Sequence, residues 1–181
     1  TKNKTREAIL KRAVLAVADR ISAGLNVIAQ AMVLILIASM LYEVVARYVF
    51  GAPTLWAFDI AYMSTGVLFV LGAAQALRED AHVRIDFLSS RLPKRVRGAI
   101  DGVAFLVVLF PVFTWLASIA GQRAWRAWTT GEVEHVSPWA PLMWPFYSAL
   151  AIGLFALALQ LLAEGLRALF DPRDDDSFKI E

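Results

Sequence analysis

The sequence contains no cysteine, and only two of its 181 residues are histidine. Without cysteine the chain forms no disulfide bond, thiolate metal site, iron–sulfur cluster or cysteine nucleophile. His82 and His135 fall in different loops between the apolar runs, so they cannot flank one haem. Neither histidine is accompanied by further ligand residues at the spacing of a metal site. We therefore expect neither a metal nor another cofactor.

Charge is also scarce, because 19% of the residues are charged and 59% are apolar. Soluble domains are nearer about 45 to 50% apolar. An apolar run of roughly 20 residues is long enough to cross the hydrocarbon core of a membrane. We expect an all-α integral membrane protein with four transmembrane helices at about 21–50, 57–78, 99–122 and 141–165. Pro111 is expected to kink the third helix, and Ser137 followed by Pro138 indicates a cap and start for the fourth.

The positive charges indicate how the chain is oriented. Of its 18 Lys and Arg residues, only Arg47, Arg123 and Arg126 lie toward one side, and the others lie in residues 1–20, 78–97 and 164–181. Positive loops stay in the cytoplasm, so we expect both termini and the 78–97 loop inside. Five of the six tryptophans fall on the opposite side, where they would form an interfacial belt.

The N-terminal segment has an amphipathic pattern. On a helical wheel Leu10, Val14 and Val17 share one face, and basic residues flank it. We expect residues 5–19 to form a helix lying on the inner leaflet, and a cytoplasmic extension of the first span is the alternative. Residues 1–170 would then be a single four-helix membrane domain, with 171–181 as a polar cytoplasmic tail.

The four apolar cores offer little chemistry. Apart from tyrosines near their ends, they contain no ionisable acid or base. A complete carrier of ionic solutes places such groups, or broken helix ends, near the bilayer midplane. Amides and hydroxyls in the cores are expected to form interhelical hydrogen bonds. We therefore expect neither an enzyme nor a complete carrier, and the net charge of +2 does not indicate a nucleic-acid partner.

Three charged residues near the outer end of the first two spans form the clearest polar pattern. Glu43 and Arg47 are one turn apart, in the order that favours an ion pair. Asp59 begins the second span, and the nine residues 50–58 are a short enough link to bring it close. We interpret the three residues as a structural knot between the first two helices, and direct contact with a solute is the alternative.

Two further patterns concern packing and the inner loop. Gly72 lies four residues before an alanine on the second span, and Gly153 lies four residues after one on the fourth. This spacing permits close approach of helices, either within this chain or with another protein. His82 and Asp86 are four residues apart, so they could share a helix face and a hydrogen bond.

The residues that form a recognisable set are Glu43, Arg47, Tyr48, Phe50, Pro53, Trp56 and Asp59, then Leu71 to Ala74, then His82 to Leu88. With this set the chain resembles the small permease subunit of tripartite ATP-independent periplasmic (TRAP) transporters, over residues from about 26 to 165. The stretch His82 to Leu88 after Leu-Gly-Ala-Ala is the more specific half. At position 59 the family more often has glutamate. Aspartate keeps the negative charge, but its shorter side chain reaches less far toward Arg47.

The resemblance implies a three-part uptake system in the bacterial inner membrane. A periplasmic substrate-binding protein captures an organic acid, such as a C4-dicarboxylate or sialic acid. A large multi-spanning permease subunit carries it across with sodium, and the small subunit is a non-catalytic scaffold surrounded by membrane lipids. The residues implied in the scaffold and its subunit interface are Glu43, Arg47, Tyr48, Trp56, Asp59, Gly72, His82 and Asp86.

The outer surface and two other functions remain open at this point. The charges at Arg123, Arg126, Glu132 and Glu134 could dock the binding protein or belong to a solvated loop. A homo-oligomeric small channel or exporter could hide a polar pathway between copies. A membrane anchor subunit of a redox enzyme is the third possibility, and the separate positions of the two histidines count against it.

Overall fold

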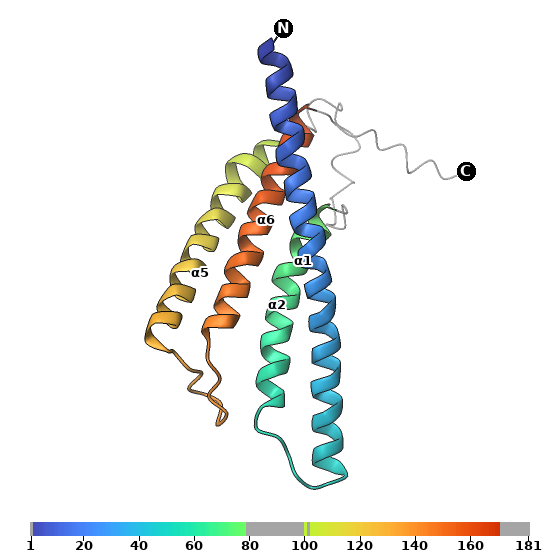
Figure 1. Cartoon of the computed structure of the whole chain (residues 1–181), viewed down its shortest axis with the longest axis vertical. Coiled ribbons are helices and arrows are strands. Elements are labelled where there is room, and N and C mark those ends of the chain that lie inside the picture. Colours follow the sequence, from blue (N-terminus) through green and yellow to red (C-terminus); the bar gives the residue numbers. More distant parts are fainter. Residues whose placement is uncertain (1, 79–99, 101, 171–181) are drawn as a thin grey trace, which may run out of the picture.

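The computed structural model describes residues 2–78, 100 and 102–170, and the regular elements there are helices (Figure 1). They are α1 (Lys2–Tyr48), α2 (Ala57–Arg78), the π-helical η1 (Ala104–Leu109), α5 (Phe110–Thr130) and α6 (Trp144–Phe170). Four stretches are long and apolar enough to cross a membrane: Asp19–Tyr48, Ala57–Leu77, Ala104–Thr130 and Trp144–Arg167. The predicted all-helical class with four spanning helices is confirmed. The tail 171–181 lies outside the described residues.

The first helix is one uninterrupted element from Lys2 to Tyr48, about 70 Å long at 1.5 Å per residue. Figure 1 shows its N-terminal part projecting beyond the other helices. Residues 2–48 contain no proline and a single glycine, so nothing in the local sequence ends the helix. The structure therefore joins residues 5–19 to the first span, which is the extension considered as the alternative, in place of a separate surface helix.

At the loop-bearing end the helices stand in a row in the order α1, α2, α6, α5, and toward the other end α1 crosses α6 (Figure 1). The two middle helices are the most enclosed, because 39% of the most apolar window of α2 and 44% of that of α6 is buried. The corresponding shares are 11% for α1 and 6% for the stretch ending at Thr130. Most of the surface of α1 and α5 is therefore uncovered.

The core lies along the contact between α2 and α6. One apolar cluster is built on Val67, Leu71 and Phe146, and a second on Ala74, Leu77, Ala156, Leu157 and Leu161. These positions recur every three or four residues, which is the repeat of one helix face. The two middle helices thus bury matching apolar faces against each other.

Gly153 permits a close approach between these two helices. A Cβ atom on Gly153 would lie 2.5 Å from Val70 Cγ1 and 3.1 Å from the carbonyl carbon of Val70. A Cβ atom on Gly72 would meet no atom within 4 Å. Of the two small-residue patterns in the sequence, the one on α6 therefore marks a helix contact inside the chain.

The third span widens just before its proline. The N–H of Phe110 donates to the carbonyl of Phe105, five residues earlier, and Pro111 follows directly. Proline has no N–H, and its ring clashes with the carbonyl four residues before it. A π-helical turn relieves both problems without ending the helix. The disturbance predicted at Pro111 thus takes the form of a local widening over Ala104–Leu109.

The third helix ends later, and the fourth begins later, than the sequence predicts. α5 continues to Thr130, where Gly131 has a φ of 63° and donates its N–H to the carbonyl of Ala127. Charge interrupts the apolar run at Arg123, but only the left-handed glycine ends the helix. The start predicted at Ser137 is wrong, because α6 begins at Trp144. Residues 131–143 instead form a hairpin-like segment with one antiparallel bridge.

We predict that Gly153→Ala destabilises the bundle, whereas Gly72→Ala does not. The new methyl group at Gly153 would press on the backbone of α2, and such overpacking costs about 1 to 3 kcal/mol of unfolding free energy. The matched alanine at Gly72 has open space and gains helix propensity, worth up to about 1 kcal/mol. Thermal unfolding of the purified protein in detergent measures both variants, and equal effects would contradict the packing described above.

Candidate functional site

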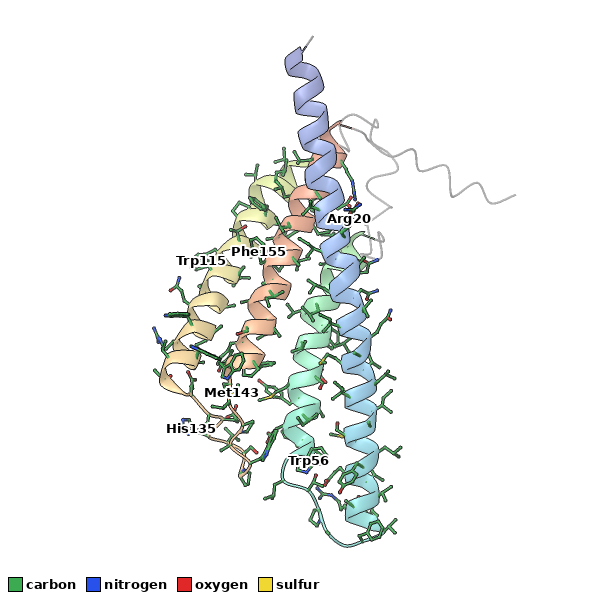
Figure 2. The ribbon with its side chains drawn as sticks, in the orientation of Figure 1. Arg20, Trp56, Trp115, His135, Met143 and Phe155 are labelled. Carbon is green, nitrogen blue, oxygen red and sulfur yellow. The ribbon has the colours of Figure 1, made fainter. Side chains whose placement is uncertain are left out.

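The polar contacts gather at the two ends of the bundle. We call the end that carries residues 49–56 and 131–143 the loop end, and the opposite end the terminal end. Figure 2 shows Trp56 and His135 at the loop end and Arg20 toward the terminal end. Between the two ends the helices meet mainly through the apolar clusters of α2 and α6.

At the loop end, Glu43 closes the turn that follows α1. Its Oε1 atom accepts a hydrogen bond from Arg47 Nε at 2.8 Å and forms an ion pair with the same guanidinium group. Its Oε2 atom accepts hydrogen bonds from the backbone N–H of Thr54, at 2.8 Å, and from the Thr54 hydroxyl. Glu43 is 9% exposed, so these donors from Arg47 and Thr54 replace the water that the carboxylate has lost.

Asp59 does not join Glu43 and Arg47, and the predicted knot of three charges is corrected here. Asp59 is buried, and its Oδ2 atom accepts a hydrogen bond from the hydroxyl of Ser137. Thr54 takes the expected place of Asp59, because it belongs to the 50–58 link and reaches Glu43 before the chain enters α2. Asp59 ties the start of α2 to the segment 131–143.

The other predicted interface residues face outward or lie beyond the described chain. Tyr48 is 79% exposed. Trp56 packs against Tyr42, with the ring centroids 5.5 Å apart. Gly72 has open space where a side chain would be. His82 and Asp86 lie in the part of the chain that the structure does not describe.

Two of the four residues predicted to dock a binding protein pair with each other. Arg123 forms an ion pair with Glu132 at 2.6 Å, and its guanidinium carbon lies 5.3 Å from the centroid of the Tyr147 ring. These contacts join α5, the segment 131–143 and α6. Arg126 is exposed on α5, one turn from Arg123. The pair therefore serves first to hold the segment against the helices.

Glu134 shapes the tip of the same segment. Its Oε1 atom accepts hydrogen bonds from the backbone N–H groups of His135, at 3.0 Å, and Val136, at 3.1 Å. The N–H of Glu134 donates to the carbonyl of Pro141 at 2.9 Å. Val136 is left 91% exposed. The segment is thus a folded hairpin with an apolar tip.

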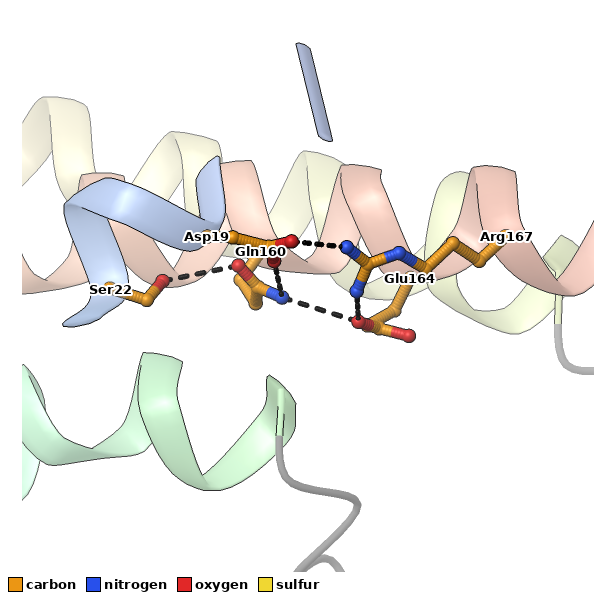
Figure 3. A network of polar contacts seen from close by, with 5 residues as sticks. All are labelled: Asp19, Ser22, Gln160, Glu164 and Arg167. Atoms are coloured by element: carbon orange, nitrogen blue, oxygen red, sulfur yellow. Dashed lines mark hydrogen bonds and ion pairs between the residues drawn. The ribbon is translucent and has the colours of Figure 1, made fainter. Parts of the chain in front are cut away.

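A polar network at the terminal end contains an interhelical hydrogen bond of the kind expected for core amides, but its charged members were not predicted from the sequence (Figure 3). Gln160 on α6 is fully buried, and its Oε1 atom accepts a hydrogen bond from the Ser22 hydroxyl on α1 at 3.1 Å. Its Nε2 atom donates to Glu164 Oε1 at 3.2 Å and to Asp19 Oδ1 at 3.4 Å. Every polar atom of the Gln160 side chain therefore has a partner.

Arg167 completes this network by joining two acids. One nitrogen lies 2.6 Å from Asp19 Oδ2 on α1, and the other forms an ion pair with Glu164 on α6. The visible signal in the sequence is spacing, because Gln160, Glu164 and Arg167 follow one another at four and three residues on one helix face. Spacing alone does not show that α1 crosses this face, and for that reason the contacts with Asp19 were missed.

These clusters are suited to holding helices together. Each carboxylate in them already accepts from a named donor, and removing one partner of a buried pair is strongly destabilising. Within residues 2–78 and 102–170, no group of three or more His, Asp and Glu side chains is placed to hold a metal ion. The site therefore consists of polar clusters that fix the helix ends, and we call them the polar clasps. The loop-end clasps are the contacts of Glu43, Asp59 and Arg123, and the terminal clasp is the network around Gln160.

We predict that Gln160→Leu lowers the unfolding free energy by about 1 to 3 kcal/mol, because the substitution leaves Ser22 and the buried acids with fewer partners. Gln122→Leu, on the exposed surface of α5, is the matched control and should change little. Chemical or thermal unfolding in detergent compares the two. A Gln160→Leu protein as stable as the control would show that the network contributes nothing.

We also predict that Ser137→Ala loosens the 131–143 hairpin. The variant loses the hydroxyl that bonds the buried Asp59, and a net loss of about 1.4 kcal/mol corresponds to a tenfold faster opening. Hydrogen exchange of the hairpin amides measures this change. Ser118→Ala is the control, because that hydroxyl donates to the carbonyl of Trp115 in its own helix. Unchanged hairpin exchange would argue against the Asp59–Ser137 tie.

Comparison with known proteins gives two partial relatives. The chain is 27% identical over 77 residues to the sialic acid TRAP transporter permease protein SiaT of Haemophilus influenzae (strain 86-028NP), covering 42% of this chain and 12% of the relative. It is 29% identical over 62 residues to the sialic acid TRAP transporter small permease protein SiaQ of Vibrio cholerae serotype O1, covering 34% of this chain and 36% of the relative. The chain thus spans only a minor part of each relative. No solved structure matches.

The family assignment comes from a longer match. Residues 36–171 match the family model described as tripartite ATP-independent periplasmic transporters, DctQ component. This range includes the loop-end clasps and the α6 half of the terminal network. The chain therefore belongs to the DctQ family of TRAP transporter small permease components.

Proposed function

We propose that this chain is the non-catalytic scaffold of a sodium-coupled, binding-protein-dependent uptake system for an organic acid. The observation that carries the proposal is the position of charge. In the four described spans each Asp, Glu and Arg lies within about two turns of a span end. A carrier of ionic solutes normally places ionisable groups or broken helix ends near the midplane. The groups that bind the solute therefore belong to another subunit.

The partner in this proposal is a large multi-spanning permease subunit. The H. influenzae relative is named a TRAP transporter permease protein, and the matching segment is 12% of its length. A segment like this chain thus occurs beside a much longer stretch of permease. The name of that relative supports sialic acid as one candidate among organic acids.

The proposed orientation places both termini in the cytoplasm of a bacterium and the loop end in the periplasm. The positive-inside rule supports it, as described for the sequence. The 131–143 hairpin would then face a periplasmic binding protein, with Arg126 and Val136 available for contact. Arg123, Glu132 and Glu134 would set its shape, and Glu43, Arg47 and Asp59 would fix the helices beneath it.

We predict that the chain alone, reconstituted into liposomes, takes up no organic acid under a sodium gradient. Addition of the large permease subunit and the binding protein of its own system should restore uptake of the acid that the binding protein holds. Radiolabelled solute measures the uptake, and liposomes with the large subunit and binding protein but without this chain are the control. Uptake by this chain alone would overturn the scaffold role. Full uptake without it would do the same.

A further inference from the structure

α1 exposes a continuous seam along the side that the row of helices leaves uncovered. The seam consists of Val27, Gln30, Leu34, Ile37, Leu41, Val44 and Tyr48. The apolar members are between 50% exposed, at Val44, and 79% exposed, at Tyr48. Successive members are alternately three and four residues apart. This spacing is the heptad repeat of a helix that packs along another helix in a left-handed pair.

Gln30 distinguishes this seam from a surface covered by lipid. It lies 11 residues after Asp19, so it is about 16 Å further along the helix, near the middle of the Asp19–Tyr48 span. Its side chain is exposed and makes no hydrogen bond within the described part of the chain. An amide without a partner in hydrocarbon costs several kcal/mol. The middle of the seam therefore requires a polar group from outside the described part of the chain.

α5, the other exposed helix, lacks this feature. Its hydroxyl residues Thr114 and Ser118 donate to the carbonyls of Phe110 and Trp115 in the same helix. Gln122 lies two turns from the end of α5, close to the exposed Trp125 and Trp128 that mark an interface with water. The polar groups of α5 can thus be satisfied against lipid. Of the two flanks of the row, α1 has the stronger need for a protein partner.

The polar clasps hold α1 in position and leave its seam uncovered. Ser22 and Asp19 hold one end of α1 to α6, and Glu43 holds the other end to Thr54. Ser22 and Glu43 lie on other faces of α1, and the seam begins at Val27, about two turns beyond Asp19, so it is an ordered helix face before any partner binds. A surface fixed in advance loses less conformational entropy on binding.

We propose that the seam binds one membrane helix of the large permease subunit, with Gln30 hydrogen-bonded to a polar group of that helix. This inference rests on the proposed function. It favours the large subunit over a second copy because the matching segment in the H. influenzae relative belongs to one polypeptide with a long permease. Covalent connection keeps the two parts at high effective concentration, so their helices meet each other more often than those of a second molecule.

Site-directed photo-crosslinking in the co-expressed, co-purified complex tests the proposal. A benzophenone-bearing amino acid replaces Leu34 or Ile37 in the seam, and Val112 or Ile119 on the exposed surface of α5 serves as the matched control. The seam positions should give an adduct of this chain with the large subunit, and the α5 positions should give mostly lipid adducts. Seam adducts with lipid only, or with a second copy, would overturn the proposal.

A second measurement addresses Gln30 itself. Gln30→Leu should reduce the amount of large subunit retained on this chain by about threefold to tenfold, the range expected for one interhelical hydrogen bond. Gln30→Asn should restore part of the loss, and Gln122→Leu should have no effect. Unchanged retention in Gln30→Leu would overturn the role of the amide. If the unsubstituted chain retains no large subunit at all, the proposed function itself fails, which separates that failure from failure of the seam.

Discussion

Hydrocarbon offers no hydrogen bonds, so each polar side chain of a spanning helix must reach the interface or find a partner in protein. The described structure follows this constraint closely. Gln160 is fully buried and has three partners, and the buried carboxylates of Glu43 and Asp59 accept from groups of neighbouring segments. Because these contacts lie at the helix ends, the middle of the bundle is left to apolar packing. The helices are thus joined by hydrogen bonds and ion pairs at their ends, and by apolar packing between the ends.

The same constraint explains the shape of the molecule. α2 and α6 bury apolar faces against each other, with Gly153 allowing close approach, while α1 and α5 are joined to them chiefly along one side. The polar clasps hold α1 in position. Glu43 bonds it to Thr54 at the loop end, and Asp19 pairs with Arg167 of α6 at the terminal end. A row of four helices held in this way presents broad apolar flanks, and such flanks in a soluble protein would aggregate. In a membrane they are available to lipid and to other helices.

Local features of this fold could be predicted from the sequence, and contacts between distant segments could not. The apolar runs predicted four helices, since each must exceed the thickness of the hydrocarbon core. The Glu43–Arg47 pair was predictable because one helical turn joins its members. Asp59 and Ser137 are 78 residues apart, and their contact depends on the order of helices in the row. The Asp19–Arg167 contact likewise depends on α1 crossing α6.

The described helices form a layer in which α1 crosses α6 at the terminal end, and this geometry bears directly on function. A solute path needs walls on all sides, whereas α2 and α6 are packed together through large apolar side chains and α1 and α5 flank them. Polar groups able to replace the hydration of an organic acid would have to lie along that path. In the described part of the chain, the charged side chains and Gln160 fix the helix ends, several hydroxyls bond carbonyls of their own helix, and Gln30 is exposed near the middle of α1. This arrangement supports the proposal that the chain adds a rigid wall to a partner, and it makes the exposed amide of Gln30 the place where that partner would supply a matching polar group.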